Sequence, residues 1–268
     1  MVGQENLLKQ LDKIQNIEDL PKSIIIAGSK GMGKHTFADT LAQKFGVWYE
    51  DIDYELSLDL LNDMYNTNII KFYLIDLEEL CKHKRLERFE NTLLKFLEEP
   101  PELAWIVLLV PSEEVVLETI RNRCQIFKLE PYSREELELL VKLYNRDLRD
   151  EDLDFLSTPG EIMTLDHNHI QTLVNLGISI ITKIGNTTPA NVISISNRFF
   201  GKENLNLDIF LNIFCKELFT CYIWSEYNQK YSDAFFLTKN FIEELKIMNV
   251  NRQYVFERFL LRLKSALR

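Results

Sequence analysis

The chain has 268 residues, of which 46% are hydrophobic and 27% are charged, the balance of a soluble, well-packed protein of one large domain or two to three small ones. Its net charge of −10 argues against independent binding to DNA, because proteins that hold DNA alone use basic surfaces to neutralise its phosphates. The charge does not exclude a subunit of an assembly whose other members hold the DNA.

The cysteines do not form a metal-binding pattern. Cys81, Cys124, Cys215 and Cys221 include no CxxC pair, and the nearest histidine, His83, completes no ligand set. We therefore expect reduced thiols and no zinc. The N-terminal stretch is too polar for a signal peptide, and no apolar run reaches the roughly 18 residues of a membrane span. We expect a soluble, cytoplasmic protein without membrane contact.

The first half of the chain alternates strand-like and helix-like segments. Apolar runs predict buried strands at 23–27, 71–76, 104–110 and 124–129. After the first strand, "HTFADTLAQKF" has an apolar residue at every fourth position, which is typical of an amphipathic helix. A second helix is predicted in "LERFENTLLKFLEEPP", where the proline pair ends it. Its shared apolar face comprises Leu86, Phe89, Leu93, Phe96 and Leu97. Strands separated by helices predict a parallel sheet covered on both faces.

From about residue 131 onward the pattern indicates helices only. Ser133, with Glu136 three residues later, forms a capping box that starts a helix over about 133–145. Shorter helices are expected over 150–156 and 161–166, and periodicity does not divide the remainder cleanly. The final helix has an apolar face that must pack on other helices or on a neighbouring subunit. That face comprises Phe256, Phe259, Leu260, Leu263 and Leu267.

The stretch "GSKGMGKHTFAD" (28–39) lies between the first strand and its helix. Gly28, Gly31, Gly33 and Lys34 match a GxxxxGK loop. In such a loop the glycines let backbone N–H groups face a phosphate, the helix N-terminus adds positive potential, and the lysine reaches the terminal phosphates. The strand–loop–helix order therefore predicts a P-loop fold rather than a chance glycine turn.

This loop lacks one of the usual magnesium ligands. The residue after the lysine normally offers a hydroxyl to Mg²⁺, and here it is His35. Thr36 has a hydroxyl, but one step along a helix turns a side chain by roughly 100°, so Thr36 is a poor substitute.

The second predicted strand ends in Asp76, where P-loop ATPases hold Mg²⁺ through water. The next position, which in many of them is a glutamate that orients the attacking water, is Leu77. Glu78 lies one place late, and in an extended strand it would point the other way. We interpret Glu78 and Glu79 as solvated residues of a loop or helix start.

Five stretches occur in a diagnostic order: "VGQENLLKQL", "GSKGMGK", "YLIDLEEL", "NTLLKFLEEPPE" and "LETIRNRCQIFKL". They cover residues 2–129, and together they resemble the clamp-loader AAA+ family, most of all the delta-prime subunits of bacterial DNA polymerase III. The resemblance implies an α/β fold with an AAA+ core (1–130), a small helical lid (131–166) and an all-helical collar (167–268). In that family the collar joins the subunits into a ring.

The resemblance also assigns a role to one arginine. The family's Ser-Arg-Cys motif reads Asn122-Arg123-Cys124 here, which makes Arg123 the arginine finger that acts in trans on the nucleotide of an adjacent subunit. A guanidinium is always charged and offers a fixed fork of donors, so it can stabilise charge that develops on a γ-phosphate. From spacing alone, a surface arginine that pairs with a nearby glutamate such as Glu118 is the alternative.

Three departures from active members of the family fall in one pocket. They are His35, Leu77 and Glu161, the last at about the place of a basic sensor residue, where a carboxylate would repel a triphosphate. The family's four-cysteine zinc insertion is also missing. We therefore expect no intrinsic ATPase activity. Weak, Mg²⁺-independent binding of ATP, ADP or phosphate without turnover stays open.

The sequence thus predicts a clamp-loader subunit that acts as a stator during DNA replication. The partners implied by the resemblance are gamma- or tau-like ATPase subunits, a delta-like subunit and, through the complex, a sliding clamp and primed DNA. Two alternatives stay open. One is an ATP-hydrolysing motor subunit that uses Thr36 and Glu78, and the other is a non-replicative AAA+ adaptor.

Overall fold

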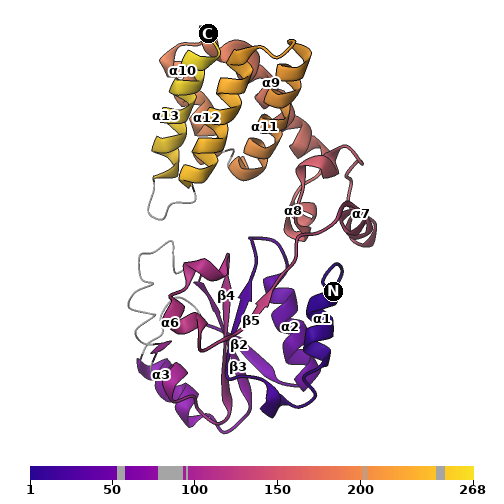
Figure 1. The fold of residues 1–268 in the computed structure, drawn as a ribbon, viewed down its shortest axis with the longest axis vertical. Coiled ribbons are helices and arrows are strands. Elements are labelled where there is room, and N and C mark those ends of the chain that lie inside the picture. The colour runs from indigo at the N-terminus through magenta and orange to yellow at the C-terminus, as the bar shows by residue number, and fades with distance from the viewer. Residues whose placement is uncertain (53–57, 78–92, 95, 202, 204, 246–250) are drawn as a thin grey trace. The chain divides into compact units, whose positions relative to one another are not determined.

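The computed structural model describes residues 1–268 except 53–57, 78–92, 95, 202, 204 and 246–250. The chain divides into two compact units (Figure 1). The first consists of Met1–Asn145 and Ser157–Thr164, and the second of Arg146–Leu156 and Leu165–Arg268. Residues 131–166, the predicted lid, are divided between these two units. The three-part division into core, lid and collar stays a prediction about function.

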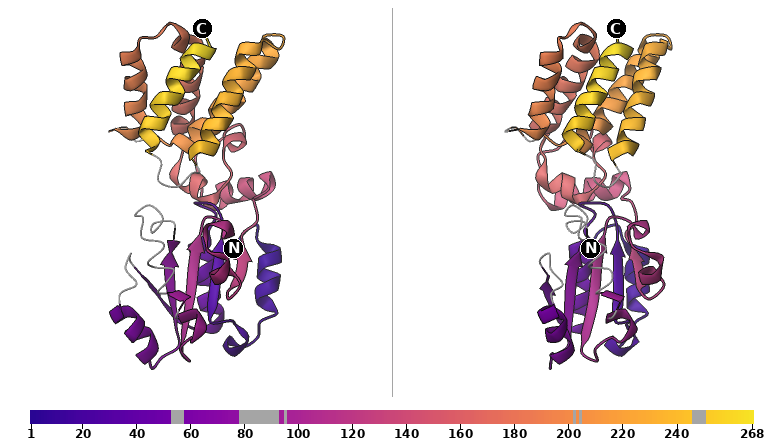
Figure 2. Two further views of the ribbon diagram at one scale, coloured as in Figure 1. Left: turned by 60° about the vertical axis from the view of Figure 1, so that its left-hand side comes forward. Right: turned by 90° about the vertical axis from the view of Figure 1, so that its left-hand side faces the viewer.

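A five-stranded parallel sheet forms the centre of the first unit, in the order β2-β3-β4-β1-β5 (Figures 1 and 2). The strands are β1 (Ser23–Ala27), β2 (Trp48–Asp51), β3 (Lys71–Asp76), β4 (Ala104–Val110) and β5 (Gln125–Lys128). The four strands predicted from apolar runs are confirmed. Strand β2 escaped prediction because it is short and lies at the sheet edge with all of its side chains exposed, so no apolar run marks it.

Each strand of the sheet interior contributes side chains to two separate cores. In β1, Ile24 belongs to the core on one face and Ile25 to the core on the other, as the two-residue period of a strand requires. Helices α1 (Glu5–Asp12) and α2 (Lys34–Phe45) cover the Ile24 face, while α3 (Leu58–Asn66) and α6 (Glu118–Arg121) cover the Ile25 face (Figure 1). Coverage on both faces explains why the strands are continuous apolar runs.

The remaining elements of the first unit are η1 (Ile17–Asp19), η2 (Glu113–Val115), α7 (Arg134–Leu143) and α8 (Pro159–Thr164). Helix α7 starts with the predicted capping box, in which Ser133 Oγ accepts from Glu136 N and the Glu136 carboxylate accepts from Ser133 N. Of the helix predicted to end at the proline pair, Leu86 and Phe89 lie outside the described residues. Leu93, Phe96 and Leu97 are helical and buried, as predicted.

The second unit is a helical bundle preceded by a short 3₁₀ helix. Its elements are η3 (Asp152–Phe155), α9 (His167–Lys183), η4 (Ile184–Asn186), α10 (Pro189–Phe200), α11 (Leu207–Trp224), α12 (Gln229–Leu245) and α13 (Arg252–Ala266) (Figure 1). The predicted 150–156 helix is thus a 3₁₀ turn. The apolar face of the final helix is confirmed, because all five of its predicted residues are buried. Among the described helices, none has the length and apolar character needed to cross a membrane.

The cysteines that the structure describes are separate thiols. Cys124, Cys215 and Cys221 are free, and Cys215 is buried. Cys81 and His83, which were weighed as metal ligands from the sequence, lie outside the described residues.

The N-terminal "VGQ" stretch is held to the end of the sheet by one buried glutamine. The Gln4 side chain is fully buried, its Nε2 donates to Glu130 O at 2.8 Å, and its Oε1 accepts from Glu130 N at 2.8 Å. This reciprocal pair continues the backbone pairing beyond β5 and fixes the start of α1. Gln4 belongs to the first of the five diagnostic stretches and acts there as a structural clamp.

We expect Gln4→Ala to lower the free energy of unfolding by about 1–3 kcal/mol, because it removes a fully buried side chain and takes from both backbone groups of Glu130 their hydrogen-bond partner. Urea denaturation followed by circular dichroism measures the change. Gln10→Ala, an exposed position on the same helix, is the matched control and should stay within about 0.5 kcal/mol of wild type. Equal losses in the two variants would contradict the clamp.

Candidate nucleotide-binding site

The P-loop joins the carboxyl end of β1 to the first turn of α2. Gly31 and Gly33 adopt positive φ angles of 81° and 94°, which glycine tolerates and other residues rarely do. Gly33 is the N-cap of α2 and supplies no side-chain cap, so backbone N–H groups of the first helical turn face the loop without one. Such a turn is suited to an anion, as the sequence predicts for a phosphate.

Lys34 is folded into the loop that it follows. Its side chain is buried, with the residue 6% exposed, and its Nζ donates to Gly28 O at 2.7 Å and to Ser29 O at 3.3 Å. These carbonyl groups satisfy part of the ammonium's hydrogen-bonding capacity within the chain itself. For Lys34 to reach a phosphate, these bonds to the loop would have to be exchanged for bonds to the ligand.

His35 extends towards the aspartate at the end of β3. His35 Nε2 lies 3.7 Å from Asp76 Oδ2, with 58% of the histidine side chain and 32% of the aspartate side chain exposed. The nearby Asp76 carboxylate raises the pKa of His35 above its ordinary value, partial burial opposes this rise, and the Asp51 charge adds a smaller contribution to it. The two positions that would hold Mg²⁺ in an active P-loop therefore pair with each other. Thr36 is exposed, and its carbonyl accepts from Thr40 Oγ1.

The residue after Asp76 serves the core rather than the site. Leu77 is fully buried among the apolar residues of the face covered by α3 and α6. A glutamate at this position would place a charge in that core, which costs several kcal/mol without a partner. Glu78 and Glu79, the other carboxylates weighed for this role, lie outside the described residues.

Glu161 is engaged at the start of its own helix. Its carboxylate accepts from Ser157 N at 2.7 Å and from Thr158 N at 3.0 Å, while Glu161 N donates to Thr158 Oγ1 at 3.3 Å. This reciprocal arrangement is a capping box that starts α8, with Pro159 at the first helical position. The residue at the expected sensor position thus stabilises a helix N-terminus.

The start of α8 is docked on the P-loop by backbone contact. Gly160 N donates to Gly31 O at 2.9 Å. A Cβ atom built on Gly160 would lie 2.6 Å from the Gly31 Cα, closer than real Cβ contacts come. From the other side, Tyr132 Oη donates to Met32 O at 3.0 Å. The loop is therefore contacted by two segments of its own chain.

Arg123 and the P-loop lie at opposite ends of the strands of the sheet. In the parallel register, Ile24 of β1 pairs with Gln125 of β5, so Arg123 precedes the amino end of β5 whereas the P-loop follows the carboxyl end of β1. The separation is about five residues of strand, or roughly 16 Å, which is beyond the reach of an arginine side chain. Arg123 cannot serve the P-loop of its own chain.

The Arg123 side chain is held but not buried. Its Nη1 donates to Thr119 O at 2.7 Å, its Nη2 lies 3.9 Å from Glu98 Oε1, and 43% of the side chain is exposed. The carboxylate near it is thus Glu98 rather than Glu118. Next to it, burial raises the pKa of Cys124 to about 12, so that thiol stays protonated. The role of Arg123 as a finger stays a prediction.

A histidine–carboxylate group in the second unit was not predicted from the sequence. Ligand atoms of Glu151, Asp152 and His167 lie within 4.8 Å of one another. The buried Asp152 accepts from Arg149 N at 2.8 Å and contacts His167 Nδ1 at 2.9 Å. These bonds satisfy the buried carboxylate within the protein and tie η3 to the start of α9.

The fold resembles those of known proteins. Among solved structures, Thermotoga maritima RuvB, a Holliday junction branch migration motor, has a TM-score of 0.52 at 15% identity over 85% of this chain and 96% of its own. A point mutant of the same protein has a TM-score of 0.54 at 13% identity over 85% and 97%. This likeness concerns the fold alone. Together with the strand order and the loop after β1, it indicates a parallel α/β fold with a P-loop after its first strand.

Sequence comparison narrows that class. A profile of the family described as "DNA polymerase III, delta subunit" matches residues 55–133. Two curated relatives are both described as DNA polymerase III subunit gamma. They come from Buchnera aphidicola subsp. Schizaphis graminum and from Buchnera aphidicola subsp. Acyrthosiphon pisum. They are 26% identical over 171 and 176 residues, which is 51% and 53% of this chain. The matches span 46% and 47% of those relatives, about half of their length. The chain is therefore similar, over part of its length, to subunits of bacterial DNA polymerase III.

Gly160→Ala tests the docked loop. We expect it to lower the free energy of unfolding by about 1–3 kcal/mol, because the new methyl group overlaps the Gly31 backbone. Gly177→Ala is the control, since a Cβ there would meet Phe214 at an ordinary 3.6 Å and alanine favours a helix interior. Guanidinium denaturation measures both. Wild-type stability in Gly160→Ala would show that the contact is loose.

Asp76→Asn tests the pair at the magnesium position. We expect the pKa of His35 to fall toward 6.5, because the interaction with the Asp76 carboxylate is the largest cause of its elevation. The raised pKa means that this pairing stabilises the fold below pH 6.5 and fades as the pH rises through the folded-state value. Titration of the ring protons by NMR measures the shift. Asp63→Asn, at an exposed position of α3, is the control and should leave the pKa of His35 unchanged. An unchanged His35 pKa in Asp76→Asn would contradict the pairing.

Proposed function

We propose that this chain is a delta-prime-type subunit of a bacterial DNA polymerase III clamp loader, that it does not hydrolyse ATP, and that it supplies Arg123 in trans to a neighbouring ATPase subunit. The observation that carries the proposal is the position of Arg123 at the amino ends of the strands, opposite to the carboxyl ends where its own P-loop lies. An arginine so placed has no use at the nucleotide of its own chain.

The condition of the chain's own loop supports the inactive role. Lys34 bonds to loop carbonyls, His35 pairs with the aspartate that would hold Mg²⁺, and Leu77 is part of the core. Hydrolysis in P-loop enzymes depends on a bound magnesium ion and a positioned water. His35 stands where the hydroxyl that binds the ion would be, and Leu77 stands where the glutamate that orients the water would be.

The chemistry of Arg123 supports the trans role. The bond from Nη1 to the Thr119 carbonyl restricts the guanidinium, while the exposed remainder leaves donors available to a neighbouring molecule. A guanidinium held before the reaction stabilises charge on a transferring γ-phosphate with little reorganisation. In the proposed assembly Arg123 therefore completes the active site of the next subunit.

The proposed assembly is a ring in the bacterial cytoplasm. Its other members are gamma- or tau-like ATPases and a delta-like subunit, and the ring as a whole opens a sliding clamp and places it on primed DNA. The acidic chain, with a net charge of −10, leaves direct contact with DNA to those other members. The helical second unit contributes the collar that joins them.

The second candidate is an ATP-hydrolysing motor subunit, favoured by the intact glycine pattern and Lys34 and by curated relatives described as gamma subunits. It requires Thr36 to replace the missing hydroxyl and Glu78 to act on the water. A non-replicative AAA+ adaptor is the third candidate. Copurification with a sliding clamp and polymerase subunits supports either clamp-loader function, and their absence supports the adaptor.

Arg123→Ala tests the trans role in a reconstituted clamp loader in which the neighbour of this chain is the sole hydrolytically competent subunit. We expect ATP turnover to fall by about 10³-fold or more, since a finger contributes that much in related chemistry. Arg134→Ala is the matched control, because Arg134 forms a surface pair with Glu138 on α7. It should leave turnover unchanged. Wild-type turnover with Arg123→Ala would reject the finger.

Nucleotide binding to the isolated full chain tests the incomplete magnesium site. We expect weak ATP binding that Mg²⁺ does not strengthen, because His35 offers no oxygen ligand. His35→Ser restores the hydroxyl and should make the binding Mg²⁺-dependent. Thr40→Ser, which places a serine farther along the same helix, should not. Isothermal titration with and without Mg²⁺ gives the comparison. Tight, Mg²⁺-dependent binding and turnover by the wild-type chain would favour the motor subunit.

A further inference from the structure

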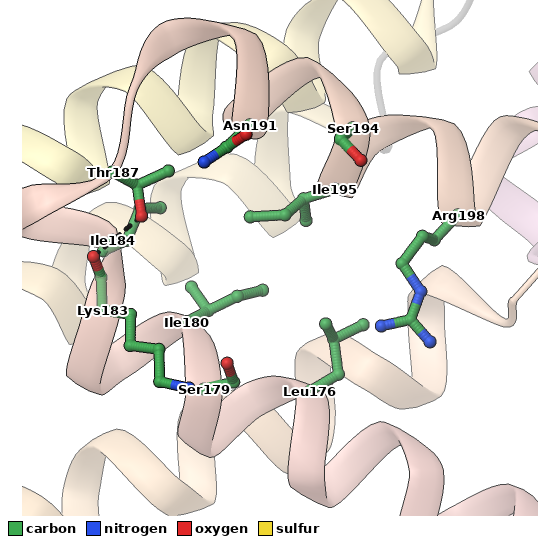
Figure 3. Close-up of a pocket in the computed structure, with 10 residues that line it drawn as sticks. All are labelled: Leu176, Ser179, Ile180, Lys183, Ile184, Thr187, Asn191, Ser194, Ile195 and Arg198. Carbon is green, nitrogen blue, oxygen red and sulfur yellow. Dashed lines mark hydrogen bonds between the residues drawn. The ribbon is translucent and has the colours of Figure 1, made fainter.

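The helices of the second unit form a bundle that is open along one seam. Helix α9 packs on α11, α11 on α12, α12 on α13, and α13 on α10, whereas no comparable packing joins α9 to α10 in the part of the chain that the structure describes. These two helices are consecutive in the sequence but are held apart through their other neighbours. A cleft of about 280 Å³ follows the seam between them (Figure 3).

The floor of this seam cleft is aliphatic. Leu176, Ile180 and Ile184 follow one another at four-residue spacing along α9 and into η4, and Ile195 faces them from α10 (Figure 3). The three residues of the α9 side are at most 7% exposed, while Ile195 is half-buried. The cleft is therefore narrow and formed in advance, with room for a small aliphatic group rather than for a whole helix.

The rim of the seam cleft carries positive charge and no carboxylate. Lys183 lies near one end and Arg198 near the other, and the polar side chains between them are Ser179, Thr187, Asn191 and Ser194 (Figure 3). Arg198 uses its Nε for Glu203 at 3.0 Å. Among the described residues, no carboxylate lies within ion-pair distance of Lys183.

The helical bundle around the cleft, residues 167–268, has the same sign of charge as this rim, whereas residues 146–156 and 165–166 add two arginines and six carboxylates and make the second unit as a whole neutral. Residues 167–268 carry 12 Lys and Arg and 8 Asp and Glu, a net charge of +4, although the whole chain is at −10. Complementary charge steers association and fixes the orientation of a bound segment. An occupant of this cleft would need acidic groups at both ends and an apolar group between them.

We propose that the seam cleft binds a short segment of a partner protein in which an aliphatic side chain is flanked by acidic residues. The aliphatic group enters the slot between Ile180 and Ile195, and the carboxylates accept hydrogen bonds from Lys183 at one end and from Arg198 at the other. The inference does not depend on Arg123 or on the P-loop, and it gives the second unit a partner-binding role of its own.

The test uses a random peptide library of about 12 residues displayed on phage, selected on the immobilised full chain. Ser194→Trp, which fills the cleft, serves for counter-selection. We expect the enriched peptides to share an aliphatic residue with acidic neighbours on both sides. Enriched peptides without acidic residues, peptides that bind Ser194→Trp equally well, or no enrichment over the bare surface would each overturn the proposal.

The charge requirement is tested separately with the enriched peptides. Fluorescence anisotropy with Lys183→Glu should show a Kd at least about tenfold higher, the loss expected for one charge-assisted hydrogen bond. Lys230→Glu makes the same charge change on α12, outside the cleft, and should leave the Kd unchanged. Equal weakening by the two variants would reduce the effect to overall charge and reject the site.

Discussion

The hydrogen bond from Gly160 N to Gly31 O docks the start of α8 on the P-loop. It joins two backbones that approach so closely that neither position has room for a side chain, and with Tyr132 it closes the loop from two directions. Lys34 completes the arrangement from inside, because it donates to the carbonyls of the loop. The loop thus contacts its own chain from several sides and joins β1, α2 and α8.

The position of Arg123 gives this joint a consequence for function. In a parallel sheet, the segments that precede the strands lie at the amino ends of the strands, and the segments that follow them lie at the carboxyl ends. Arg123 precedes β5, and the P-loop follows β1. An arginine placed in this way is out of reach of the nucleotide site of its own chain and is exposed to another molecule. In the function proposed above, the loop acts as a structural joint, and Arg123 acts on the nucleotide of a neighbouring subunit.

The sequence predicts the sheet well because its interior strands are covered on both faces and read as apolar runs. It does not predict β2, whose exposed side chains give no pattern. Glu161 was interpreted through the family as a missing sensor, although Thr158 and Glu161 already form the T-x-x-E pattern of a capping box, which the structure contains. The contact between Gly31 and Gly160 links two positions far apart in the chain and has no local signature.

Amide hydrogen exchange at Gly160 tests the central claim most directly, because this N–H group makes the bond that closes the loop. The measurement compares the full chain alone with the chain at an MgATP concentration that saturates active P-loop enzymes. A self-closed loop predicts that the Gly160 amide is protected without nucleotide and that MgATP leaves its exchange rate unchanged. An amide that exchanges freely in the chain alone and becomes protected only with MgATP would contradict the account.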